Sequence, residues 1–236
     1  MQEETKTTQP QEERQTEKMT GPMQPVVDMG SVTVKNARGT IHTLTIIGQI
    51  EGHQLASSSS KTTKYEHVMP LLAMMEQSED IDGVLFLLNT VGGDVEAGLG
   101  IAELIAGMRK PTVSLVLGGG HSIGVPLAVA ARVSMIVPTA SMTIHPVRMN
   151  GTVIAAPQTY RYFQQLQESI VSFVTEHSHI RREKFMELML QSDQLAADVG
   201  CVLYGQEAVQ AGLVDRCGSL GDALDCLYEM IRKEKQ

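Results

Sequence analysis

A serine framed by glycines is the residue best suited to covalent chemistry. Ser122 lies in the segment GGGHSIG, residues 118–124, between two apolar runs. The glycines relieve crowding around the serine, and the free amides and dipole at a helix start favour a developing oxyanion. A serine in such a place is also a common helix N-cap. The residues alone leave both interpretations open, whereas a phosphate-binding loop is disfavoured because no lysine follows the last glycine.

A second pair of glycines follows another apolar run. In NTVGGD, residues 89–94, Gly92 and Gly93 separate a strand-like segment from a helix-like one. Because neither residue has a Cβ atom, their backbone N–H groups can point outward and bind developing negative charge. A tight strand-to-helix turn explains the same glycines equally well.

One histidine is held in an extended segment. His145 ends the alternating run SMTIH and precedes Pro146, which disfavours a helical backbone at the residue before it. Near a glycine-framed serine, an imidazole with an ordinary pKa of about 6.5 is a candidate general base. A partly exposed histidine at a strand end, with no chemical role, is the alternative.

The pattern of apolar residues predicts the elements that must position these segments. Strands are predicted at 41–50, 84–88, 112–117, 133–137 and 142–145, and helices at 65–77, 95–108, 122–131, 159–176, 182–190, 206–211 and 220–232. This alternation predicts an α/β fold with parallel strands and with helices outside the sheet.

Composition and charge disfavour several classes of protein. The 236 residues, 42% hydrophobic and 19% charged, are enough for one large core, and the net charge of −8 offers no general positive field for nucleic acid or anionic membranes. Residues 111–131 carry no formal charge, but three glycines, a histidine and a proline interrupt them. We therefore expect no transmembrane segment.

The N-terminus and the cysteines bear on domain organisation and location. The first 25 residues are polar and lack the apolar core of a signal peptide, so they are predicted to be a disordered tail before one domain at 26–236. The three cysteines show neither a C-x-x-C pair nor zinc-ligand spacing. This usage predicts a reducing, cytoplasmic location and no structural metal.

The ordered motifs resemble those of the ClpP peptidases, serine peptidases of the ClpP/crotonase fold group. The likeness is carried by LNTVGGDVEAG, MRKPTVSLVLGGGHSIGVPLAVAA and VPTASMTIHPVRMNG, between Leu88 and Gly151. GQIE with His53 upstream, and GQEAVQAGLVD at 205–215, extend it to about residues 41–217. The resemblance implies an α/β spiral of β-β-α units with a protruding handle helix, whose place is taken by residues 159–176.

The resemblance also implies roles for the residues singled out above. Ser122 matches the nucleophile of the family, His145 its general base, and Gly93 and Ile123 the two N–H donors of its oxyanion hole. The order along the chain would be Ser, His, Asp.

The acid of this triad is the residue that the motifs place least directly. Counted without gaps, Ala196 stands at the family position, while a two-residue deletion brings Asp198 into place. Asp198 is therefore the predicted acid, and Asp193 is the reserve candidate. A loop or helix-cap role for Asp198, with a dyad working alone, is the alternative.

The implied activity is that of a serine endopeptidase on peptides or unfolded protein segments, by acyl transfer and without a metal or organic cofactor. Similar proteins form homo-oligomeric rings served by an ATPase unfoldase. The wording DVGCVLYGQEAV and the polar tail are most similar to a translocation-associated member, which implies work with the secretion machinery on secretory precursors. Two rivals stay open: a non-catalytic scaffold or adaptor of the same fold, and an acyl-CoA enzyme of the crotonase type.

Overall fold

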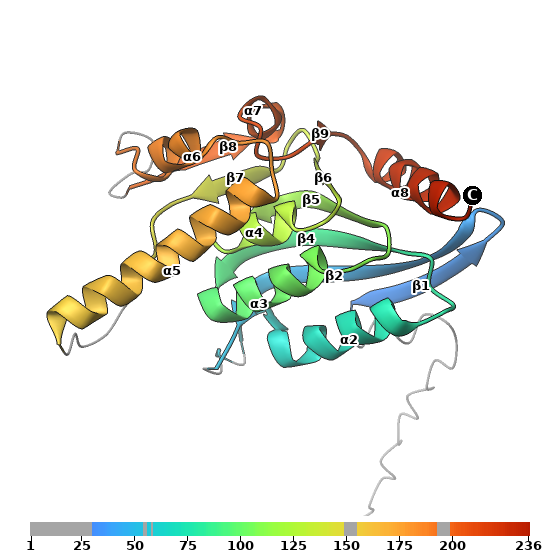
Figure 1. Cartoon of the computed structure of the whole chain (residues 1–236), viewed down its shortest axis with the longest axis horizontal. Coiled ribbons are helices and arrows are strands. Elements are labelled where there is room, and N and C mark those ends of the chain that lie inside the picture. The colour runs from blue at the N-terminus through green and yellow to red at the C-terminus, as the bar shows by residue number, and fades with distance from the viewer. Residues whose placement is uncertain (1–29, 54–55, 58, 149–154, 193–198) are drawn as a thin grey trace, which may run out of the picture.

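The structure is a computed structural model that describes residues 30–53, 56–57, 59–148, 155–192 and 199–236, and these ranges contain nine strands and seven helices (Figure 1). The strands are β1 (Ser31–Asn36), β2 (Gly39–Glu51), β3 (Thr62–Lys64), β4 (Gly83–Gly93), β5 (Thr112–Gly120), β6 (Val133–Ile136), β7 (Ser141–Ile144), β8 (Cys201–Tyr204) and β9 (Arg216–Cys217). The helices are α2 (Tyr65–Gln77), α3 (Val95–Ala106), α4 (Gly124–Val129), α5 (Ala156–Glu176), α6 (Arg182–Met189), α7 (Gly205–Gln210) and α8 (Leu220–Glu234). The predicted α/β class is confirmed, while the predicted tail at 1–25 lies outside the described residues.

Parallel strands form the centre of the sheet. The strand order is β1-β2-β4-β5-β6-β9, with β3 beside β2, and the neighbours from β2 to β9 run parallel. Strand β7 joins β5 through one residue pair, Gly119 with Ser141, and pairs antiparallel with β8. Strand β1 is also antiparallel to β2. The predicted parallel strands therefore make up most of the sheet, and β1 and β8 add antiparallel pairs to it.

Alternate side chains of the central strands are buried on opposite faces of the sheet. Leu44, Phe86 and Val116 belong to the larger core, which packs against α2, α3 and α4. Leu85 and Leu115 lie on the other face, in a smaller core closed by α8. Figure 1 shows α8 set apart from the helices of the larger core. Burial on both faces is typical of parallel strands between two helical layers.

Helix α5 projects beyond the sheet, as expected for the predicted handle. Its N-terminal half extends away from the other elements in Figure 1, and Tyr160 and Tyr162 on that half are exposed. Its last turns are anchored in the core by Val171, Phe173 and Val174. In the described ranges, no helix has both the length and the apolarity needed to cross a membrane.

The boundaries near the glycine segments differ from the prediction. Strands β4 and β5 continue through the glycines that were expected to form turns, and end at Gly93 and Gly120. The helix expected at 122–131 shortens to α4, whose N-cap is Ile123. Ser122 does not start this helix, because its φ of 57° is left-handed and a right-handed helix cannot begin there.

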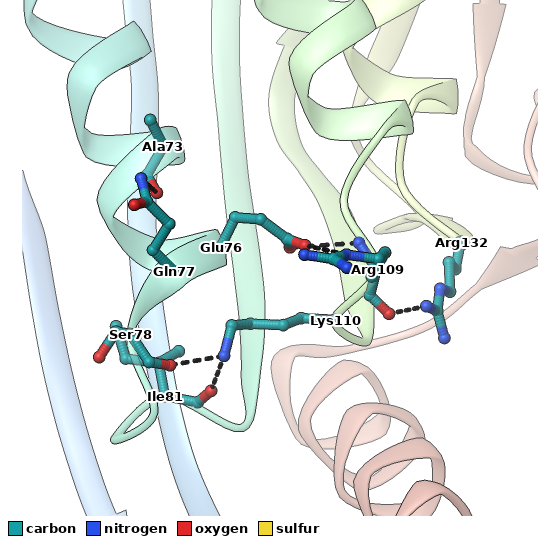
Figure 2. A network of polar contacts seen from close by, with 8 residues as sticks. All are labelled: Ala73, Glu76, Gln77, Ser78, Ile81, Arg109, Lys110 and Arg132. Atoms are coloured by element: carbon teal, nitrogen blue, oxygen red, sulfur yellow. Dashed lines mark hydrogen bonds and ion pairs between the residues drawn. The ribbon is translucent and has the colours of Figure 1, made fainter.

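A polar network joins neighbouring elements at the edge of the sheet where β4, β5 and β6 begin, opposite the edge that carries the glycine segments (Figure 2). Lys110 donates to the carbonyl oxygens of Ser78 and Ile81 at 2.6 and 2.5 Å. The Arg109 side chain pairs with Glu76 at 2.9 Å. Arg132 donates to the Arg109 carbonyl oxygen, and it also pairs with Glu234 near the end of α8.

Candidate active site

Ser122 occupies a sharp turn between β5 and α4. Its φ of 57° is rare for a residue with a side chain; such a backbone costs about 1–3 kcal/mol and persists only where its surroundings enforce it. The enforcement is visible on both sides. The Ser122 N–H donates to the Thr143 carbonyl oxygen at 2.8 Å, and the Ser122 carbonyl oxygen accepts from Val125 N–H at 3.0 Å. A strained serine between a strand and a helix is the geometry that exposes the nucleophilic hydroxyl in α/β-hydrolases.

The first glycine turn packs directly against this serine. A Cβ atom on Gly92, whose φ is 89°, would lie 2.6 Å from Ser122 Cβ. A Cβ atom on Gly93, whose φ is 153°, would lie 2.2 Å from the Ile50 carbonyl oxygen. Both positions therefore require glycine, and the two glycine segments that the sequence singled out meet at one place.

One backbone amide beside Ser122 has no acceptor in the part of the chain that the structure describes. The N–H groups of Ser122, Gly124 and Val125 all donate to carbonyl oxygens at 2.8–3.0 Å. Within the described residues, Ile123 N–H makes no hydrogen bond. Since backbone donors are nearly always paired, an unpaired amide next to a strained serine is suited to a transient oxyanion. Gly93, the other predicted donor, lines the same cavity as Ser122 and Ile123.

His145 lies one residue beyond the end of β7 and lines that cavity too. Its Nδ1 atom lies 2.7 Å from the Pro146 carbonyl oxygen. Because a carbonyl oxygen only accepts, Nδ1 carries the proton and the neutral ring keeps Nε2 as its acceptor. Within the described chain, no hydrogen bond joins Ser122 to His145.

The cavity between these residues is small and mostly apolar. It encloses about 140 Å³. Its apolar wall comes from α3, α4, α5, α6 and β7, and is formed by Val95, Val125, Ile144, Ile170, Phe185 and Met189. A dry cavity of about 150 Å³ lined by aliphatic and aromatic side chains is known to take up benzene. The space is therefore of the right order for one apolar side chain.

The predicted acid and its reserve, Asp198 and Asp193, lie outside the described residues. The chain on either side of them is described, and it passes beside the histidine. Ile144 pairs with Cys201 across β7 and β8, and a Cβ atom on Gly200 would lie 2.9 Å from His145 Cβ. Gly200 N–H donates to the Gln191 carbonyl oxygen at 2.7 Å, which brings the two flanks together.

Polar residues that the sequence analysis did not single out hold the two glycine segments together. Asn89 Oδ1 accepts from Gly119 N–H at 2.9 Å, and buried Thr90 donates to the Gly48 carbonyl oxygen at 2.6 Å while accepting from Gly92 N–H at 3.0 Å. His121, next to the serine, lies 2.8 Å from Thr143 Oγ1 through its Nδ1 atom. The signal available in the sequence was the polar pair Asn89-Thr90 at the end of an apolar run.

Among the residues that the structure describes, no group of three or more histidine, cysteine, aspartate or glutamate side chains is arranged to hold a metal ion. Cys201, beside Ile144, is buried, and burial raises the pKa of its thiol to about 11. It is therefore a neutral core residue at neutral pH.

Comparisons with known proteins agree with this architecture. A model of the Clp protease family matches residues 39–219. The translocation-enhancing protein TepA of Halalkalibacterium halodurans is 52% identical over 219 residues, which cover 92% of this chain and 86% of TepA. The resemblance to ClpP peptidases, and within them to the translocation-associated member, is confirmed, as is a ClpP-like fold.

Proposed function

The chain belongs to the Clp protease family, and on this premise we propose that it is a serine endopeptidase that hydrolyses peptides or unfolded protein segments. The observation that carries the proposal is the meeting, in one cavity, of a strained Ser122, the His145 imidazole and the Ile123 amide, which has no acceptor among the described residues. Gly93 supplies the second oxyanion donor. These four roles are those that the family resemblance implies.

The proposed reaction proceeds through an acyl-enzyme. Ser122 Oγ attacks the peptide carbonyl carbon while His145 Nε2 accepts the hydroxyl proton, and the amides of Gly93 and Ile123 receive the oxyanion. The C–N bond then breaks as His145 returns the proton to the leaving amine. Water, deprotonated by His145, hydrolyses the ester and restores the Ser122 hydroxyl. Each oxyanion donor would lower the barrier by about 3–4 kcal/mol.

The geometry of His145 supports its role as base. The Pro146 carbonyl oxygen fixes the tautomer in which Nε2 is free to accept a proton. The missing Ser122–His145 bond does not contradict this role, because such bonds are often long in empty sites and tighten when substrate binds.

We assign the acid to Asp198. It stands two residues before Gly200, and two residues of chain span about 7 Å at most. Gly200 lies against His145. Asp198 would replace the Pro146 carbonyl oxygen at Nδ1 and stabilise the charged imidazole. We expect Asp198→Asn to lower kcat by about 10⁴-fold and Asp193→Asn to leave it unchanged. Normal rates of peptide amide hydrolysis in both variants would show that neither aspartate is the acid of the triad.

The apolar cavity supports a preference for substrates with one apolar side chain next to the cleaved bond. The name of the relative TepA adds the biological setting: we propose that the chain assists translocation of secretory precursors. Homo-oligomeric rings, a cytoplasmic location and delivery of substrate by an ATPase unfoldase or by the secretion machinery belong to the same proposal.

A non-catalytic scaffold or adaptor for precursors is the second candidate function. One observation favours it: no hydrogen bond links the His145 ring to Ser122 in the described residues. The ring is instead bonded through Nδ1 to the adjacent Pro146 carbonyl oxygen. The strained backbone of Ser122 argues against it, since a mere scaffold has no need of such a turn.

Covalent labelling with a fluorophosphonate distinguishes the two functions. The full chain should be labelled on one residue, and Ser122→Ala should abolish labelling while its oligomeric state and thermal midpoint stay unchanged. A folded oligomer that takes up no label, and that hydrolyses neither a peptide ester nor a peptide amide, would contradict the peptidase and leave the scaffold.

A further inference from the structure

The serine and the histidine of the proposed site are carried by strands that barely touch. Strand β7, which leads to His145, pairs with β5 only through Gly119 and Ser141. Its other edge is paired along all four residues, but with β8. The β7–β8 unit therefore depends on other contacts to fix its position against the turn that carries Ser122.

Thr143 supplies two of those contacts. Its carbonyl oxygen accepts from Ser122 N–H at 2.8 Å, and its Oγ1 atom lies 2.8 Å from Nδ1 of His121. One residue of β7 thus holds both the serine and the residue before it. Thr143 is two positions from His145, so in the extended chain any shift at Thr143 passes directly to the histidine.

His121 is fixed on its other sides as well. Its N–H donates to the Thr90 carbonyl oxygen at 3.2 Å, and its carbonyl oxygen accepts from Gly124 N–H at 2.8 Å. Its ring fills a space that only glycine leaves open, since a Cβ atom on Gly119 would lie 2.6 Å from the ring atoms Cδ2 and Nε2. The ring is half-buried, and this burial lowers the pKa of His121. The burial therefore favours the neutral form of the ring beside Ser122.

We propose that His121 and Thr143 are positioning residues, whose side-chain hydrogen bond sets the separation between Ser122 and His145. Neither residue lines the cavity beside Ser122. The proposal rests on the proposed peptidase function. It adds that the alignment of base and nucleophile is held by a side-chain contact between the two strands.

Removal of the Thr143 hydroxyl tests this proposal in the full chain. Thr143→Val keeps the shape of the side chain and the main-chain bond to Ser122, while Thr143→Ser keeps the hydroxyl. We expect Thr143→Val to lower kcat for a peptide ester, and the limiting rate of fluorophosphonate labelling, by about 10–100-fold, because a misplacement of about 1 Å costs this much. KM should stay within about twofold, since binding contacts are intact. Thr143→Ser should restore the rate to within about threefold of the native value.

A second variant shows whether the two side chains act together. His121→Leu removes the ring nitrogen that meets the Thr143 hydroxyl and keeps an apolar side chain of similar size. Its loss of rate should match that of Thr143→Val, and the double variant should be no slower than either single one, because one shared interaction can be lost only once. Additive losses, a change in KM alone, or failure of serine to rescue would overturn the proposal. If Thr143→Val does not fold, His121→Leu and its comparison with Thr143→Ser carry the test.

A measurement without turnover separates this proposal from the peptidase function. In protein labelled with ¹⁵N-histidine, the ring resonances of His145 should move in Thr143→Val and return in Thr143→Ser. If the native chain proves inert towards fluorophosphonate, the peptidase fails, but these shifts still show whether the contact positions His145. Unchanged His145 resonances in Thr143→Val would refute the positioning role whether or not the chain is a peptidase.

Discussion

The two edges of the parallel sheet hold their polar groups by different means. Where β4 and β5 end, the important groups are backbone amides and one serine, fixed by glycines that leave no room for a Cβ atom. Where the same strands begin, charged side chains such as Arg109 and Lys110 join neighbouring elements (Figure 2). At the first edge, the glycine edge, the backbone conformation fixes the positions of the polar groups. At the second, the charged edge, side chains join neighbouring segments.

This difference indicates which of the two edges the proposed peptidase activity depends on. Exposed ion pairs such as Arg109–Glu76 contribute about 0–1 kcal/mol and are easily replaced. A serine that has a left-handed backbone conformation and packs on Gly92 has no such substitute. Changes at the glycine edge should therefore alter reaction rate, and changes at the charged edge should alter only stability.

The largest effect is expected from His145. His145→Gln retains a polar side chain but removes the group that can accept and return a proton at neutral pH. We expect kcat/KM for a peptide amide to fall by more than about 10⁴-fold, while the thermal midpoint stays near the native value. Steady-state hydrolysis and calorimetry measure the two quantities. Retention of most of the activity would mean that another group is the base.

The sequence predicted the elements well where side-chain periodicity is strong. Helix α2 was predicted with its observed bounds, Tyr65–Gln77, because its apolar residues recur at helical spacing. Strand β1 was missed because it is an edge strand with mostly exposed side chains, and β9 because it has only two residues. The ends of β4 and β5 were placed too early because glycines usually break strands.

The site was predicted only as far as local motifs reach. Ser122, His145 and the Gly92-Gly93 pair were singled out from their segments, and the family resemblance added Ile123. The structure places Ser122, His145, Gly93 and Ile123 around one cavity. The left-handed backbone of Ser122 was not anticipated. Contacts between distant residues, such as Thr143 with the ring 22 positions before it, left no signal, because they arise only when strand pairing brings the segments together.

A methyl group at Gly92 should damage both the fold and the site. In Gly92→Ala the new Cβ atom would lie 2.6 Å from Ser122 Cβ, on a backbone with φ of 89°. We expect a loss of about 1–3 kcal/mol in the free energy of unfolding, and a loss of fluorophosphonate labelling. Gly100→Ala is the matched control, because nothing lies within 4 Å of its Cβ position in α3. That variant should gain up to about 1 kcal/mol and label normally. Equal labelling of both variants would show that close packing at Gly92 is unimportant.

The cavity wall should set side-chain preference more gently. Val125→Ala enlarges the cavity beside Ser122. The ratio of kcat/KM for a peptide ester with phenylalanine before the cleaved bond to that for one with leucine should rise about tenfold. Val129→Ala is the control, because Val129 is buried on the same helix but does not line the cavity. It should lower stability and leave the ratio unchanged. An equal shift in both variants would place the selecting pocket elsewhere.

The smallest effects belong to the charged edge, where two neighbouring residues offer a matched pair. Lys110→Met keeps the apolar stem but removes the donor to the Ser78 and Ile81 carbonyl oxygens, so we expect a loss of about 1 kcal/mol in the free energy of unfolding. Arg109→Met should lower the free energy of unfolding by about 0.5 kcal/mol or less, since that side chain is 89% exposed. This loss should shrink in high salt, which screens the ion pair. Denaturant unfolding at two salt concentrations measures both losses. Neither variant should change kcat, because neither residue lies near the cavity. A clear fall in kcat in either variant would mean that the two edges of the sheet are coupled, and that strain at Ser122 depends on how the far ends of its strands are tied.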